Sequence, residues 1–209
     1  AAAAGIAKIL FVVFMALFVP GAIVALRLGL GGYGAEPVKN ATREIGLWTI
    51  RLLFLSLAIT PARRLLRWPR LIAVRRMVGV AAFAYALAHL AVYTIDQGLD
   101  LAKVAQEIVL RIYLTIGFVA LLGLAALAAT STDGMMRRMG GRAWQRLHSL
   151  AYPIGLLALV HFFLQARIDL REPMVMAGLF AWLMLFRLQA RLSGEASPSI
   201  LWTAGLGLA

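Results

Sequence analysis

Three histidines carry the chemistry that this sequence offers, namely His89, His148 and His161. Each lies in an apolar stretch long enough to cross a membrane, where an ionisable side chain is costly and is therefore a hypothesis about function. The chain contains no cysteine, so it can form no disulfide, no thiolate metal site and no covalent haem attachment. Imidazoles on two helices could bind the iron of a non-covalent, b-type haem from both sides. Hydrogen bonding between helices is the alternative use for them.

The elements that position these histidines are expected to be membrane helices. Of the 209 residues, 62% are hydrophobic and only 14% are charged, which is too little charge for a soluble domain. The net charge of +12 is concentrated between the apolar stretches, which indicates anionic lipid headgroups and not nucleic acid as the partner. We predict an all-α polytopic membrane protein in which residues 1–192 form one six-helix bundle and 193–209 form a short tail. The six spans, each near the roughly 20 residues that cross hydrocarbon, are expected at about 6–28, 45–60, 75–95, 109–129, 147–166 and 173–192.

Arginine and lysine residues indicate the orientation of the bundle. Six arginines lie in the connection between the second and third spans and at the start of the third. Four more lie between the fourth and fifth spans beside a single acid, whereas the other connections balance or outnumber their bases with acids. We therefore expect the two basic connections, and with them both termini, on the cytoplasmic side of the membrane.

This orientation places the histidines in depth. His89 and His161 are expected at the same level near the outer face, while His148 lies near the cytoplasmic face at the level of Arg75. Fourteen residues at about 100° each bring Arg75 to within about 40° of the helix face that carries His89. The thirteen residues from His148 to His161 end about 140° apart on an ideal helix, a mismatch that a kink at Pro153 would reduce.

Other residues near these levels have two or more interpretations. His148 could ligate an inner haem, bind a quinone headgroup or face interfacial water. Arg75 could pair with a haem propionate or a flavin phosphate, or serve only as a positive charge at the membrane surface. Arg51 lies within a span, where a guanidinium needs a carboxylate or propionate partner. Tyr152 could pack against a porphyrin or against a neighbouring helix.

Four segments together resemble the MsrQ family, also called YedZ, which consists of haem-binding membrane subunits of periplasmic methionine-sulfoxide reductase systems. The resemblance covers roughly residues 29–192. The segments are GYGAEPVKN (32–40), LAITPARRL (57–65), RRMVGVAAFAYALAHL (75–90) and WQRLHSLAYPIGLLALVHFF (144–163). The resemblance implies a bundle of the ferric reductase-like type, in which two pairs of histidines on two helices hold two stacked b haems.

Carried over residue by residue, the resemblance assigns His89 and His161 to the outer pair of haem ligands and His148 to the inner pair. Arg75 occupies the position of the remaining inner ligand. Because an arginine is a very poor iron ligand, one haem is expected and a second is left open.

The resemblance further implies an electron-transfer subunit of an oxidoreductase. It would take electrons from the quinone pool or a cytosolic flavin reductase and pass them to a periplasmic molybdopterin enzyme that repairs oxidised methionine. Flavin mononucleotide (FMN) is also attributed to the family. The alternative is a stand-alone ferric or quinone-linked reductase, but those enzymes usually carry a cytosolic flavin domain, which we do not expect here. A transporter is disfavoured, because the spans hold few acids and show no inverted repeat.

Overall fold

The computed structural model describes residues 2–166 and 169–192, and this part of the chain contains helices and no strands. Six helical segments in it are long and apolar enough to cross a membrane, which confirms the predicted all-α class. The predicted tail at 193–209 lies outside the described residues. In chain order the helices are α1 (Ala2–Gly29), α2 (Pro37–Leu65), the 3-10 turn η1 (Pro69–Leu71), α3 (Ile72–Asp96), α4 (Leu101–Leu110), α5 (Ile112–Ala129), α6 (Asp133–Met139), α7 (Gly141–His148), α8 (Ala151–Gln165) and α9 (Arg171–Leu192).

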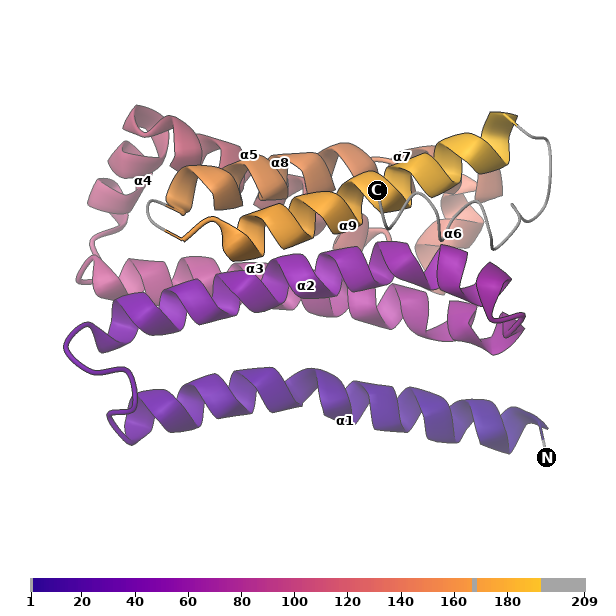
Figure 1. Cartoon of the computed structure of the whole chain (residues 1–209), viewed down its shortest axis with the longest axis horizontal. Helices are drawn as coiled ribbons and strands as arrows, with labels where there is room; N and C mark the ends of the chain where they lie inside the picture. The colour runs from indigo at the N-terminus through magenta and orange to yellow at the C-terminus, as the bar shows by residue number, and fades with distance from the viewer. Residues whose placement is uncertain (1, 167–168, 193–209) are drawn as a thin grey trace.

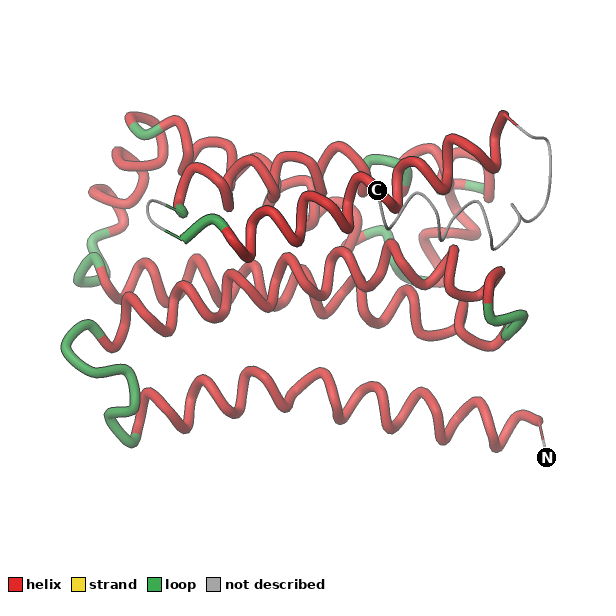
Figure 2. Tube along the Cα trace, in the orientation of Figure 1, coloured by secondary structure: helices red, strands yellow, loops and turns green. Residues whose placement is uncertain are grey.

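The long helices run side by side, and the connections between them gather at the two ends of the bundle (Figures 1 and 2). One end carries α4, the α1–α2 connection and the start of α9, and we call it the α4 end. The opposite end carries the N-terminus, the α2–α3 connection, α6 and α7, and we call it the α6 end. The two arginine-rich connections therefore lie at the same end of the molecule.

Three parts of the chain differ from the expected spans. The second span, expected at about 45–60, is the longer helix α2 (Pro37–Leu65). The segment between the third and fourth spans contains α4, a short helix capped by the Asp100 carboxylate, which accepts a hydrogen bond from the backbone N–H of Lys103. The fifth span is two helices, because α7 ends at His148 and α8 begins at Ala151. Pro153 lies in the first turn of α8, where a missing N–H costs no helical hydrogen bond. The break between α7 and α8, and not a kink at Pro153, therefore separates the directions of the two histidines on this span.

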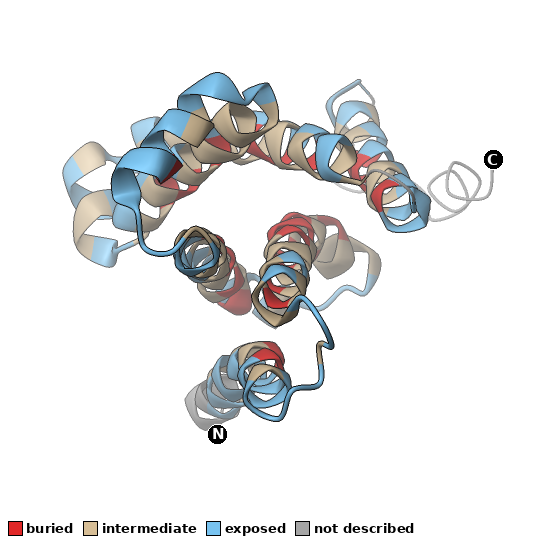
Figure 3. Cartoon of the chain, turned by 90° about the vertical axis from the view of Figure 1, so that its left-hand side faces the viewer, coloured by how far each residue is buried: buried red, intermediate tan, exposed pale blue. Residues whose placement is uncertain are grey.

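The core of the bundle is centred on α2. Half of the residues in the apolar window of α2 are buried, against 11% in α1. Figure 3 shows the buried residues turned toward the space between helices, with exposed residues on the outer faces. A helix that is apolar on its exposed faces is suited to contact with lipid. The largest fully buried side chains include Leu53, Phe54 and Leu57 of α2 and Leu183 and Phe186 of α9.

Pro20 interrupts α1, and a residue of α3 completes the hydrogen bonding there. Proline lacks an N–H and clashes with the preceding turn, which opens the helix locally. The hydroxyl of Tyr85 accepts a hydrogen bond from the Gly21 N–H (2.8 Å) and donates one to the Leu17 carbonyl (2.7 Å). These two backbone groups would pair with each other in an unbroken helix. Tyr85 therefore supplies hydrogen-bond partners to the two backbone groups beside Pro20 and holds α1 against α3.

Pro61 interrupts α2 near the α6 end, and a residue of α9 compensates for it. In a regular helix the Leu57 carbonyl would accept a hydrogen bond from the N–H at position 61, which proline does not have. Arg187 supplies that donor, because its Nη2 donates to the Leu57 carbonyl at 2.6 Å. Its Nη1 donates to the Leu183 carbonyl at 2.9 Å. This charged side chain within a membrane helix thus has a definite structural role.

Candidate functional site

His89 of α3 and His161 of α8 lie next to each other, as their common depth predicted. Their ring centroids are 6.3 Å apart and their ring planes are inclined at 83°. Both side chains are partly buried. The sequence therefore predicted correctly that these two histidines, 72 positions apart in the numbering, lie close together, while their role as metal ligands stays a prediction.

Each imidazole is fixed by a backbone carbonyl of a neighbouring helix. The Nδ1 of His89 lies 2.9 Å from the Thr42 carbonyl oxygen of α2. The Nδ1 of His161 lies 2.7 Å from the Tyr113 carbonyl oxygen of α5. A carbonyl only accepts hydrogen bonds, so both Nδ1 atoms must carry the proton. In a neutral imidazole this leaves Nε2 with a free lone pair, which is the form that binds a metal ion.

The separation of the two rings fits a single metal ion between them. Metal–imidazole bonds are about 2 Å long and a ring nitrogen lies about 1 Å from its ring centre, so two imidazoles on opposite sides of one ion have ring centres about 6 Å apart. Within the described residues, no group of three or more His, Cys, Asp or Glu side chains could hold a metal ion. Two donors do not complete a coordination sphere, so the other ligands must arrive with the metal. Haem iron meets this condition because the porphyrin supplies four nitrogens.

His148 lies apart from this pair, at the end of α7. Its Nδ1 is 3.1 Å from the Trp144 carbonyl oxygen and its Nε2 is 3.3 Å from the Ser131 hydroxyl. Its ring stacks on Trp144 with the centroids 3.8 Å apart. Both ring nitrogens thus have partners within the chain, and ligation of an inner haem by His148 would exchange the Ser131 contact for iron.

Arg75 and Tyr152 form a second group with His148. Arg75 is within electrostatic range of Tyr152, Arg187 and His148, as the matched depth of Arg75 and His148 predicted. Tyr152 is engaged by Arg187, whose Nε lies 3.2 Å from the Tyr152 hydroxyl and whose guanidinium lies over the ring at 4.9 Å. This group carries two arginines, which suits an anionic ligand. We refer to Arg75, His148, Tyr152 and Arg187 as the arginine group.

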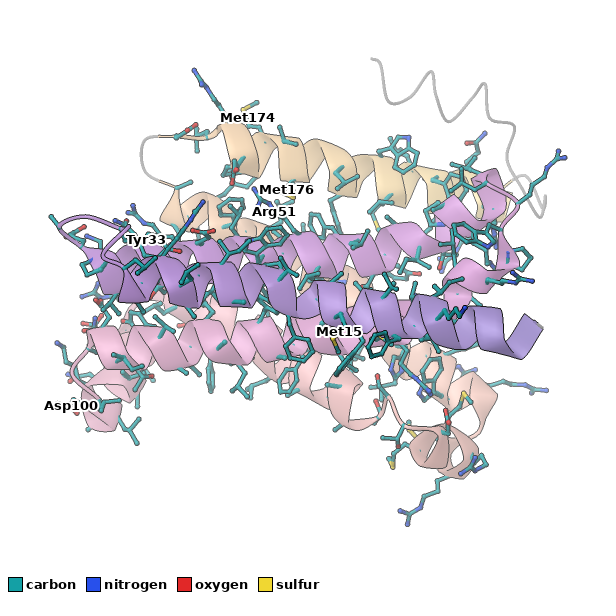
Figure 4. All side chains as sticks on the ribbon, turned by 90° about the horizontal axis from the view of Figure 1, so that it is seen from below. Met15, Tyr33, Arg51, Asp100, Met174 and Met176 are labelled. Atoms are coloured by element: carbon teal, nitrogen blue, oxygen red, sulfur yellow. The ribbon has the colours of Figure 1, made fainter. Side chains whose placement is uncertain are left out.

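Arg51 has the carboxylate partner that its position within a span required. Its Nη2 lies 3.0 Å from the Glu172 Oε1 at the start of α9, and its guanidinium lies 5.1 Å from the ring centre of Trp48. Figure 4 labels Arg51 on α2 and Met174 and Met176 in the first turns of α9. The ion pair therefore connects these two helices.

The turn after α1 is tied to α2 at the α4 end. Tyr33, labelled in Figure 4, donates a hydrogen bond to Glu44 at 2.7 Å, and Arg27 pairs with the same carboxylate at 3.1 Å. Burial, followed by the hydrogen bond and charge of Glu44, raises the pKa of Tyr33 to about 12. These contacts fix the start of segment 32–40 against α2, at the end of the bundle where the histidine pair lies.

Several residues of the site were not identified from the sequence. The carbonyls of Thr42 and Tyr113 gave no signal, since every residue has a carbonyl and only the fold selects these two. Arg187 did give a signal, because it lies within the predicted sixth span just as Arg51 lies within the second.

Comparison with known proteins agrees with this architecture. A family model described as the ferric reductase like transmembrane component matches residues 45–159, a range that includes His89 and His148. The protein-methionine-sulfoxide reductase heme-binding subunit MsrQ of Rhodospirillum rubrum is 42% identical over 189 residues, which cover 88% of this chain and 91% of that protein. The MsrQ protein of Xanthomonas campestris is 48% identical over 175 residues, covering 82% of this chain and 78% of that protein. A protein of the same name from Caulobacter vibrioides is 42% identical over 189 residues, with 89% and 90% covered. The chain therefore belongs to the MsrQ family of ferric reductase-like transmembrane proteins.

Proposed function

We propose that this chain is a haem b-binding membrane subunit that passes electrons to a protein-methionine-sulfoxide reductase. The observation that carries the proposal is the pair formed by His89 and His161, with both Nδ1 protons held by backbone carbonyls and a ring separation that suits one metal ion. The printed names of the relatives, which describe heme-binding subunits of such a reductase, support the same function.

The chain's part in this function is ligation and positioning. His89 and His161 would hold the iron through Nε2, and bound haem would supply reversible one-electron chemistry. Hydrogen bonds to backbone carbonyls increase the basicity of the two imidazoles and stop their rotation, so the ligands need little rearrangement between oxidation states. The surrounding apolar helices exclude water and favour a low local dielectric constant, which contributes to the reduction potential.

The membrane orientation is part of the proposal. The arginine-rich connections lie together at the α6 end, which favours that end facing the cytoplasm of a bacterium with both termini on that side. The histidine pair would then lie near the periplasmic face of the inner membrane. The segment 32–40 and α4 would be exposed to the periplasm, where a molybdopterin-containing reductase subunit could dock.

We propose that the arginine group lies at the point where electrons enter. Arg75 and Tyr152 would contact an anionic or polar cofactor, either the phosphate of FMN or a quinone headgroup, with the donor being a quinol or a cytosolic flavin reductase. His148 would serve the same site, or it would ligate a second haem. Arg51 was expected to have a carboxylate or a propionate partner, and Glu172 supplies the carboxylate by pairing with one of the five N–H donors of the guanidinium, which leaves the others able to contact a propionate.

The proposal is tested by measuring haem content in purified protein as the pyridine haemochrome, for the wild type and for His89→Ala, His161→Ala and His148→Ala. We expect a low-spin b-type spectrum that is lost in the first two variants and retained in His148→Ala. Loss of a separate fraction of haem in His148→Ala would assign a second haem to the arginine group. Wild-type protein that takes up no haem after supplementation would overturn the function proposed here.

A further inference from the structure

The two histidines of the pair are seated in the same way on two different helices. His89 bonds to the carbonyl of Thr42, four residues before Gly46 on α2. His161 bonds to the carbonyl of Tyr113, four residues before Gly117 on α5. In a helix the carbonyl of residue i faces the N–H of residue i+4. Each imidazole therefore approaches a helical carbonyl from the side, beside the residue that already donates to that carbonyl.

Glycine at that fourth position makes the approach sterically accessible. A Cβ atom at position 46 would lie 2.9 Å from both Nδ1 and Cε1 of His89. A Cβ atom at position 117 would lie 2.7 Å from Nδ1 and 2.8 Å from Cε1 of His161. Contacts this short do not occur with real methyl groups, so the ring would have to withdraw and its Nδ1 would leave the carbonyl. Both glycines have ordinary helical backbone conformations, so backbone strain does not explain them.

We propose that Gly46 and Gly117 are positioning residues for the two haem-ligating imidazoles. Each opens a notch in a helix surface through which the Nδ1–H of a histidine reaches the backbone carbonyl, which fixes the tautomer and the direction of Nε2. Loss of the notch weakens the hydrogen bond, lowers the basicity of the imidazole and disfavours ferric iron. The part of this inference that concerns haem rests on the function proposed above, while the steric part does not.

The first test uses protein without haem and is therefore independent of the proposed function. Gly46→Ala is made in the wild type and in His89→Ala, and the thermal midpoint of the apo form is measured in detergent. Alanine is the better helix former, so it should stabilise the helix when no imidazole is present. We expect Gly46→Ala to lower the midpoint in the wild type and to leave it unchanged or raise it in His89→Ala. The same sign of effect in both backgrounds would refute the notch.

The second test measures haem binding in Gly46→Ala and Gly117→Ala. Loss of the hydrogen bond to the other ring nitrogen of a metal-ligating histidine typically lowers metal affinity by about 10–100-fold. We therefore expect haem affinity to fall by about that factor and the haem midpoint potential to shift to a more positive value. Gly123→Ala on α5 is a matched control, because its Cβ would lie 2.7 Å from Ile154 and touch no histidine. It should lower stability without moving the potential. Gly79→Ala on α3, with nothing within 4 Å of its Cβ, should leave the potential unchanged and should not lower stability, because alanine is the better helix former.

The two failures are distinguishable. Wild-type protein that binds no haem would overturn the proposed function. The thermal midpoints of the apo-protein variants at Gly46 and His89 would still test the notch. Haem-loaded Gly46→Ala and Gly117→Ala with wild-type affinity and potential would overturn the positioning role while leaving the function intact. A potential that moves equally in Gly123→Ala would also overturn it, because general loosening of α5 against α8 would then be the cause.

Discussion

Replacement of Arg187 by methionine tests whether a charged residue of α9 repairs the proline break in α2. The substitution keeps an apolar stem of similar length and removes every donor of the guanidinium. The Leu57 carbonyl already lacks its helical donor, because Pro61 has no N–H. The substitution also removes the Nη2 that donates to this carbonyl at 2.6 Å. We therefore expect a loss of stability that depends on Pro61.

The magnitude follows from the hydrogen bonds that are lost. A hydrogen bond to a charged group contributes about 1.5–3 kcal/mol in water-soluble proteins. Bonds between membrane helices average about 0.6 kcal/mol and reach about 1.7 kcal/mol. We expect the contact between Arg187 and the Leu57 carbonyl to contribute about 1–2 kcal/mol, which corresponds to roughly 2–8 °C in the midpoint of a protein of this size.

The assay is a double-mutant cycle of thermal midpoints in detergent with Arg187→Met, Pro61→Ala and the combined variant. Alanine at position 61 supplies the missing N–H to the Leu57 carbonyl, so Arg187→Met should cost less in that background by the 1–2 kcal/mol estimated above. Arg191→Met, an exposed arginine one turn further along α9, is the control and should have little effect. Equal costs of Arg187→Met in both backgrounds would refute the repair of the proline break.

Three further predictions concern contacts between helices. Tyr85→Phe leaves the two backbone groups of the α1 kink without their bridge and should cost about 1–2 kcal/mol, measured as the thermal midpoint. Asp133 pairs with Arg76, and the hydrogen bond and charge of that guanidinium lower the pKa of the carboxyl. The stabilisation by the pair is thus present above the usual aspartate pKa of about 4 and is lost as the pH falls through the lowered pKa of Asp133. Asp133→Asn should therefore reduce the thermal midpoint slightly near pH 7, and should have no effect in strong acid or at high salt. Glu172→Gln should cost at most about 1 kcal/mol and leave haem content unchanged, whereas Arg51→Gln should also lower haem content if its other donors hold a propionate.

The spans and the histidine pair could be predicted from the sequence because both follow from hydropathy and depth. His89 and His161 needed only the order of the spans and the rise of a helix to be placed at one level. The direction of His148 could not be predicted in the same way. The fifth span was expected to be one helix with a kink at Pro153, but the chain breaks between His148 and Ala151, before that proline.

The carbonyls that accept hydrogen bonds from the two histidines could not be predicted from the sequence, for a different physical reason. A carbonyl becomes a special acceptor only when another helix packs against it, so Thr42 and Tyr113 carry no local signal. Pro61 did indicate that the Leu57 carbonyl lacks its helical donor, but the residue that supplies one comes from the other end of the chain. Glycines in membrane helices are common, so Gly46 could be distinguished only after the imidazole was seen beside it.

The histidine pair is built on four helices, which links the geometry of the two imidazoles to helix packing. Each histidine comes from one helix and is oriented by the backbone of another, His89 of α3 by α2 and His161 of α8 by α5. Rotation of either helix within its pair would break an Nδ1 contact. Helices α1 and α9 supply neither ligands nor these carbonyls, and their contacts through Tyr85 and Arg187 act on proline breaks elsewhere. The chain thus separates two tasks: α2, α3, α5 and α8 build the histidine pair, and α1 and α9 brace the bundle around it.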